Sequence, residues 1–172
     1  MKNELIYELN KSFQNIFNDK EALSSFENYY KALVSWLKHN MHLLQGKVEQ
    51  DKRLVVLLEL DPYEYVVKNP GLVLSWEKER VGSRTFEAID NMLMSIGDTL
   101  WDMVTIYSEK SCPRCDDGLR YVIAEDERII YKELTLECDT CGWAEHLDGR
   151  EWEFGVVEKI IPANKKDIAE LS

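Results

Sequence analysis

The sequence predicts an α+β fold, in which an N-terminal helical bundle is followed by a small antiparallel β module. Through residue 107 the apolar residues recur every three or four positions, which is the spacing of one helix face. After Lys110 the spacing shortens to two, as in a half-buried strand. All four cysteines fall in this second part, in two pairs of the form Cys-x2-Cys. We therefore expect a helical domain over residues 1–107, a β module over 108–161 and a tail over 162–172.

Three stretches of the first part carry clear helical stripes. The first runs from Leu5 to Phe17, and the second from Ala22 to Leu44, with Gly46 placed to end that helix. The third follows Ser83, a residue type that caps helices, and runs from Phe86 to Tyr107. Each stripe needs an apolar partner, so the helices are expected to form a bundle.

The stretch from Leu54 to Trp76 is ambiguous. Its segments "LVVLLELD" and "GLVLSW" fit either a buried helix or a short strand, with breaks at Asp61-Pro62 and at Asn69-Pro70-Gly71. We favour helix because the neighbouring segments are helical.

The β module begins with two predicted strands, "LRYVI" and "RIIYKELTLE", which are rich in β-branched and aromatic residues. The polar segment "AEDE" lies between them and is predicted to be their turn. A further strand is expected in "WEFGVVEKII", residues 152–161, and Pro162 would end it. No regular structure is predicted for the tail.

The spacing of the cysteines indicates a metal site. One Cys-x2-Cys turn lets two sulfurs grip the same ion while backbone N–H groups of the turn point at them, and two such turns give a tetrahedral all-sulfur site that favours zinc. The sequence has no apolar stretch of 18 residues and its start, "MKNELIYELNKSF", lacks the layout of a secretory signal. We expect a cytoplasmic protein without a membrane span, where paired cysteines hold metal more often than disulfides.

The pattern Cys-Pro-Arg-Cys, hairpin, Cys-Asp-Thr-Cys-Gly resembles the zinc-ribbon superfamily over about residues 110–147. One departure is visible, because Gly142 directly follows the second pair whereas Asp116-Asp117-Gly118 follows the first. The first turn is therefore expected to be looser or more exposed. The resemblance implies four metal ligands, which are Cys112, Cys115, Cys138 and Cys141.

The predicted role of the metal is structural. A zinc ion with four thiolates has no open position for water or substrate, and the strands alone are too few to form a core, so one Zn²⁺ is expected to fold the module. Iron in a rubredoxin-like site is the alternative metal. A redox switch that ejects zinc is conceivable, although four mutually ligated cysteines are usually inert.

No catalytic motif is present. The chain lacks a Gly-rich phosphate loop, a G-x-S-x-G motif and a Cys/His pair outside the metal turns. His39 and His42 could share a metal but have no Glu-x-x-His companion, and His146 is expected at the surface. Carboxylate pairs on the helices are expected to be solvated rather than to act as acid and base. We predict a non-enzymatic protein.

The charge is acidic and uneven. The chain has 21 basic and 32 acidic side chains, a net charge of −11. Residues 1–107 hold 12 basic and 16 acidic residues, a net of −4, whereas residues 108–172 hold 9 and 16, a net of −7. Such a module repels phosphate backbones and attracts basic partners, so direct binding to nucleic acid is not expected. Solubility alone is the competing explanation of the acidic balance.

A small acidic protein without a catalytic motif resembles, in overall character, the bacterial toxin-immunity proteins. This resemblance implies an inhibitor that covers a basic, nuclease-like toxin domain, with acidic groups that steer the encounter and an aromatic anchor that slows release. Trp152 is an alternative anchor, and packing of the ribbon on the helical bundle is the simpler role for either tryptophan. The alternative function is a zinc-ribbon regulator acting with nucleic acid or the transcription machinery. The candidate contact residues are Asp116, Asp117, Glu125, Asp126, Glu127, Trp143 and Asp148.

Overall fold

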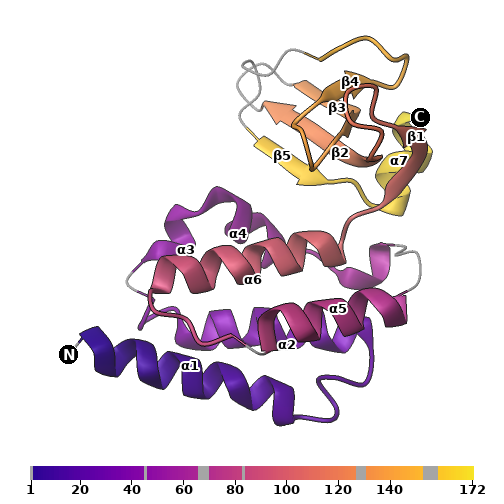
Figure 1. The fold of residues 1–172 in the computed structure, drawn as a ribbon. Helices are drawn as coiled ribbons and strands as arrows, with labels where there is room; N and C mark the ends of the chain where they lie inside the picture. Colours follow the sequence, from indigo (N-terminus) through magenta and orange to yellow (C-terminus); the bar gives the residue numbers. More distant parts are fainter. Residues whose placement is uncertain (1, 45, 66–69, 83, 127–130, 153–158) are drawn as a thin grey trace. The chain divides into compact units, whose positions relative to one another are not determined.

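The computed structural model describes residues 2–44, 46–65, 70–82, 84–126, 131–152 and 159–172 (Figure 1). Helices come first and an antiparallel sheet follows, which confirms the predicted mixture of helix and sheet. The chain divides into two compact units. The helical unit comprises residues 1–63 and 69–103, and the β unit comprises residues 64–68 and 104–172.

The helical unit contains four longer helices and several short ones (Figure 1). Helix α2 packs against α1, α5 and α6, so it lies at the centre of the unit. No described helix has the length and apolar character that a membrane span requires. The elements are α1 (Lys2–Asn18), α2 (Phe26–Asn40), α3 (Lys47–Gln50), α4 (Lys52–Leu57), the 3₁₀ turn η1 (Pro62–Glu64), α5 (Pro70–Gly82) and α6 (Ile89–Met103).

The core of the helical unit is built from the predicted stripes. Phe13 of α1 is fully buried, and its ring meets the rings of Phe17, Trp36 and Phe86 edge to face at centroid distances of 5.6, 5.1 and 5.9 Å. Such pairs add to the stability that the burial of apolar area provides. Fully buried side chains from three helices complete this core, namely Leu9, Tyr29, Leu33, Leu37, Met92, Ile96 and Leu100.

The structure corrects the predicted ends of two helices. Helix α2 starts at Phe26 rather than Ala22, because the Ser25 side chain accepts a hydrogen bond from the backbone N–H of Asn28 and caps the helix there. It ends at Asn40, residues 41–44 form turns, and Gly46 has a φ of +71°. Helix α6 ends at Met103 instead of reaching residue 107. In the ambiguous segment after Leu54, α4, η1 and α5 are helical, as favoured, whereas residues 58–61 form turns and irregular backbone.

The β unit is a five-stranded antiparallel sheet with one short helix. Its strands are ordered β1-β2-β3-β4, and β5 also pairs with β2. Strand β1 pairs with residues 118–120 of β2, and β5 pairs with residues 122–125, so the two lie end to end along one edge of β2. The elements are β1 (Tyr107–Ser111), β2 (Gly118–Asp126), β3 (Tyr131–Glu137), β4 (Ala144–His146), β5 (Lys159–Pro162) and α7 (Lys165–Leu171).

A segment from the middle of the chain completes this unit. The Tyr65 side chain is buried and its hydroxyl donates a hydrogen bond to the Pro162 carbonyl at 3.4 Å. The Asn164 amide donates to the Glu64 carboxylate at 3.3 Å. The β unit is therefore discontinuous in sequence.

Three predictions for the β module need correction. Ala124, Glu125 and Asp126 of the expected turn belong to strand β2, because β3 pairs with all three residues and β5 pairs with Ala124 and Glu125. Of the expected strand 152–161, residues 159–161 lie in β5, which includes Pro162, and residues 153–158 lie outside the described part. The tail contains helix α7, whose start is stabilised by a capping box between Asn164 and Asp167.

Candidate metal centre

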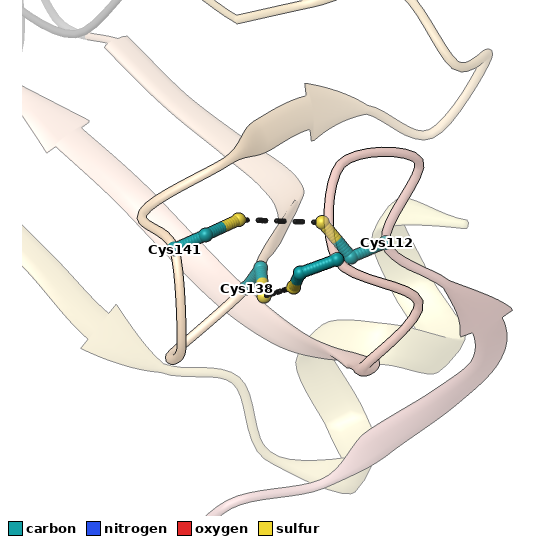
Figure 2. A group of neighbouring side chains, drawn as sticks. Cys112, Cys138 and Cys141 are labelled. Carbon is teal, nitrogen blue, oxygen red and sulfur yellow. Dashed lines mark hydrogen bonds between the residues drawn. The ribbon is translucent and has the colours of Figure 1, made fainter.

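The two cysteine pairs lie in turns at one end of the sheet. The first cysteine turn, residues 112–118, connects β1 to β2, and the second, residues 138–143, connects β3 to β4. Arg120 pairs with Glu137 in the β2–β3 ladder, and this register brings the start of β2 and the end of β3 together. Figure 2 shows the cysteine side chains pointing toward one another from the two turns. We call the part of the β unit formed by these two turns the metal end.

The four sulfurs have the arrangement of a metal site. Their Sγ atoms all lie within 4.8 Å of one another. No disulfide joins them. A tetrahedral ion with metal–sulfur distances of about 2.3 Å needs sulfurs about 3.8 Å apart, so small movements would seat one ion. The arrangement is compatible with one Zn²⁺. Within the part of the chain that the structure describes, no other group of His, Cys, Asp and Glu side chains gathers in this way.

The two turns share one backbone design. In the first, Cys112 N–H donates to the Asp117 carbonyl at 2.6 Å and Asp116 N–H donates to the Cys112 carbonyl at 2.9 Å. In the second, the corresponding bonds run from Cys138 to Trp143 at 2.7 Å and from Gly142 to Cys138 at 3.0 Å. The first turn is therefore hydrogen-bonded like the second, not looser.

Asp116 occupies the position that glycine holds in the second turn. Its φ is 63°, close to the 70° of Gly142, and it is the one non-glycine residue with positive φ among the described residues. A Cβ at Gly142 would meet no atom within 4 Å, so the requirement at this position comes from the backbone conformation. The sequence was compatible with a positive φ at this position, because aspartate tolerates this conformation better than most residues.

Polar side chains tie the two cysteine turns together. The Asp117 carboxylate accepts hydrogen bonds from the Thr140 hydroxyl and from Gly118 N–H, and these two bonds hold the pKa of Asp117 below its usual value. Arg120 is buried and contacts Glu137 at 3.0 Å and Asp139 at 2.8 Å. The sequence does not predict the contacts of Thr140 and Arg120, because the two residues of each contact lie far apart along the chain.

Backbone N–H groups of the first turn stabilise the thiolate form of Cys112. Arg114 N–H donates to the Cys112 sulfur at 3.4 Å. Desolvation raises the pKa of Cys112, but hydrogen bonds from the Arg114 and Cys115 N–H groups and from the Cys141 and Cys115 thiols outweigh it and bring that pKa down to about 7. The N–H groups of Asp117 and Trp143 act in the same direction on Cys115 and Cys141, but desolvation and the neighbouring thiols raise the pKa of both above its usual value. Metal binding requires thiolates, so a turn that stabilises one matches the chemistry of a metal site.

The predicted contact residues do not form one surface. Asp116 and Asp117 are exposed at the metal end, whereas Glu125 lies farther along β2 and forms ion pairs with Lys132 and Lys159. Asp126 is 2% exposed, so it cannot serve as a surface contact. Glu127 lies outside the described residues.

The remaining candidates have partners within the β unit. Asp148 is exposed and pairs with Arg150 at 2.7 Å. Trp143 is half-buried, and the Arg114 guanidinium lies 4.6 Å from its ring centroid. The alternative anchor, Trp152, is buried against Ala124 and Ala144, which both belong to the β unit.

The histidines lie away from the four sulfurs. His39 and His42 are exposed on and just after α2. His146 is half-buried, and its Nδ1 lies 2.5 Å from Glu133 Oε1. The carboxylates of α6 are engaged in ion pairs, Asp90 with Lys47, Asp98 with Arg53 and Asp102 with Arg80.

Comparisons with known proteins give one partial likeness. Over 111 residues the chain is 26% identical to "Peptide chain release factor subunit 1" of Thermococcus onnurineus (strain NA1), a stretch that covers 64% of this chain and 25% of that protein. The chain thus spans about a quarter of the length of this relative. No family model matches the chain, and no solved structure matches it.

Proposed function

We propose that the β unit is a zinc ribbon and that the protein is a non-enzymatic binder whose acidic metal end docks onto a basic protein. The observation that carries this proposal is the charge of the metal end. Asp116 and Asp117 are exposed there, and so is Asp139 of the second turn. Zinc with four thiolates would add a formal charge of about −2 beside them.

Among the described residues of the β unit, the basic side chains support the same polarity, because they are already engaged in ion pairs. At the metal end, Arg114 pairs with Glu151 at 2.9 Å and lies over Trp143. A nucleic-acid surface would instead present free lysines and arginines. Salt bridges within the β unit involve Lys110, Arg114, Arg120, Lys132, Arg150, Lys159 and Lys166.

The sharpest form of the proposal is an immunity-type inhibitor that neutralises a basic, nuclease-like toxin domain. Acidic groups would steer the toxin domain to a fast encounter, and the rate would fall as salt screens the charges. Trp143 would act as anchor only together with Arg114, because the guanidinium lies over its ring. Asp116 is the sharpest contact candidate, since its carboxylate has no partner among the described residues.

The test is co-purification with a basic toxin domain encoded by a neighbouring gene, followed by measurement of association rates and toxin activity. The informative variant is Asp116→Asn combined with Glu109→Gln, two exposed acids of the first turn and of β1. We expect the association rate to fall about tenfold at low salt and to converge with the wild type at high salt. The matched control is Glu49→Gln with Glu87→Gln on the helical unit, which changes the net charge equally. No association at low salt would remove the inhibitor hypothesis.

A second candidate is a role in translation as a zinc-ribbon regulatory protein. What favours it is the likeness to a peptide chain release factor subunit. Because residues 104–172 are only 69 residues long, the 111 aligned residues must include part of the helical unit. The likeness is therefore not confined to the β unit.

Co-sedimentation with ribosomes tests this second candidate. Ribosome binding that persists at moderate salt would favour the role in translation over the inhibitor, provided that the Asp116→Asn and Glu109→Gln pair does not change it. Anisotropy of labelled single-stranded RNA separates direct RNA binding from protein contacts, since RNA binding weakens steeply with salt.

A further inference from the structure

The four sulfurs differ in exposure and fall into two close pairs. Cys115 and Cys141 are exposed, whereas Cys112 and Cys138 are buried. Each exposed sulfur lies beside a buried sulfur of the other turn, with Cys112 Sγ 3.4 Å from Cys141 Sγ and Cys115 Sγ 3.5 Å from Cys138 Sγ. Figure 2 shows both contacts as lines that cross from one turn to the other.

We propose that the metal centre is also a peroxide-sensitive oxidation site, at which the disulfides Cys112–Cys141 and Cys115–Cys138 take over the structural role of the metal ion. The two exposed sulfurs are the points of attack, and the two buried sulfurs complete the bonds. The inference goes beyond the proposed binding function and rests only on the metal that this proposal places at the four cysteines.

The distances favour bonds between the turns. A disulfide needs a sulfur–sulfur distance of about 2.05 Å, so each close pair has to move together by roughly 1.4 Å. The backbone of each turn is held by its own two hydrogen bonds, so we expect side-chain rotation to supply most of this movement. A bond within one turn would leave no covalent link between the two turns once the metal had left.

The chemistry balances with a hydroperoxide as oxidant. The Cys141 thiolate attacks the outer peroxide oxygen, the O–O bond breaks, and the products are a sulfenic acid and an alkoxide, or hydroxide when the oxidant is hydrogen peroxide. The Cys112 thiolate then attacks the sulfenic sulfur, the S–S bond forms and hydroxide leaves. Two electrons pass from two thiolates to one peroxide. The same sequence at Cys115 and Cys138 consumes the other two ligands, and the metal departs as a dication.

The consequence is that oxidation and metal binding stabilise the same arrangement of the turns. Metal-free reduced protein has nothing to hold the metal end together except the polar links around Asp117 and Arg120. Metal-free oxidised protein has two covalent links in the same place. The β unit is therefore expected to stay folded after oxidation and to loosen after chelation.

The test uses the full wild-type chain, loaded with zinc and treated with hydrogen peroxide. Metal release is followed with a zinc-sensitive dye, and remaining thiols are blocked at acidic pH before digestion. Trypsin cuts after Arg114 and Asp-N protease cuts before Asp139, so the two enzymes separate all four cysteines into different peptides. Mass spectrometry then reads the pairing directly.

We expect about one zinc ion released per two disulfides, with the pairs 112–141 and 115–138 dominant. Amide exchange in β2 and β3 should stay slow in the oxidised protein and become fast in reduced protein stripped by a chelator. Pairing within the turns, oxidation to sulfinic or sulfonic acids in place of disulfides, or fast exchange in the oxidised protein would each overturn the inference.

Discussion

Asp116 shows how a single residue carries both structure and charge. It adopts the left-handed backbone that its counterpart Gly142 adopts, and it exposes a carboxylate beside the metal ligands. A residue with a Cβ is strained in this conformation, although aspartate is strained less than most. The sequence showed a departure from the ribbon pattern here. It could not show that the backbone keeps the same turn, because that depends on hydrogen bonds to residues four and five positions apart.

Replacing this residue gives a prediction for stability. Asp116→Gly should raise the free energy of unfolding of the metal-loaded β unit by about 1 kcal/mol, because glycine adopts this conformation without strain. Gly142→Asp, the same exchange in the second turn, should lower it by a similar amount. Urea unfolding at fixed zinc concentration measures both. An unchanged or lower stability of Asp116→Gly would contradict the account of the turn.

A second residue gives a pH dependence in the helical unit. Glu77 is buried beside Arg80 and Thr99, and burial raises the pKa of Glu77 above its usual value, with Arg80 and Thr99 opposing the shift only in part. A folded-state pKa above the unfolded one means that this group favours the folded state at low pH and loses that contribution as pH rises. Relative to wild type, Glu77→Gln should therefore become more stable as pH increases from 4.5 to 7. Unfolding measured across this range checks the sign. A stability difference that does not vary with pH would rule out the titration.

At the scale of elements, strand β2 explains a failed prediction. The polar letters of "AEDE" indicate a turn when read alone. In the fold, Ala124 is fully buried, and Glu125 lies between Lys132 of β3 and Lys159 of β5. Strand β5 comes more than 30 residues later and pairs with β2 as far as Glu125, while β3 pairs with β2 as far as Asp126. The residues around "AEDE" cannot predict pairing with a strand so far away in sequence. The metal end could be predicted, because each Cys-x2-Cys pair is a short local motif.

The segment around Tyr65 is a second element that local pattern does not identify. Tyr65 belongs to the β unit although it lies between helical segments, and it is buried, whereas Tyr63 two residues earlier is 55% exposed. Tyr65→Ala should lower the free energy of unfolding of the β unit by about 3 kcal/mol, as large-to-small changes in a core do. Tyr63→Ala is the matched control and should cost much less. Amide exchange of β2 and β3 measures both variants, and equal effects would mean that Tyr65 does not anchor the unit.

At the scale of the molecule, the change of apolar period near Lys110 correctly predicted helices followed by a sheet. The predicted border at residue 107 lies four residues after the end of α6, because Val104 and Tyr107 happen to continue the helical spacing. The helical core followed from its stripes, since burial of one helix face is a local property of sequence. The polar contacts of the metal end could not be predicted in this way, because each joins residues from different turns or strands.

The division into two units makes a prediction about cooperativity. The metal ligands all lie in the β unit, so loss of the metal should loosen that unit and leave the helical unit folded. Cys138→Ser should have the same effect as chelation, because it removes a buried ligand.

The most direct test of the metal centre combines metal analysis with amide hydrogen exchange on the same preparation. The account predicts about one zinc ion per purified chain. After removal of zinc under reducing conditions, exchange in β2 and β3 should become fast while exchange in α2 and α6 stays slow. A protein that contains no metal, or one whose β2 and β3 amides remain protected when reduced and metal-free, would contradict it.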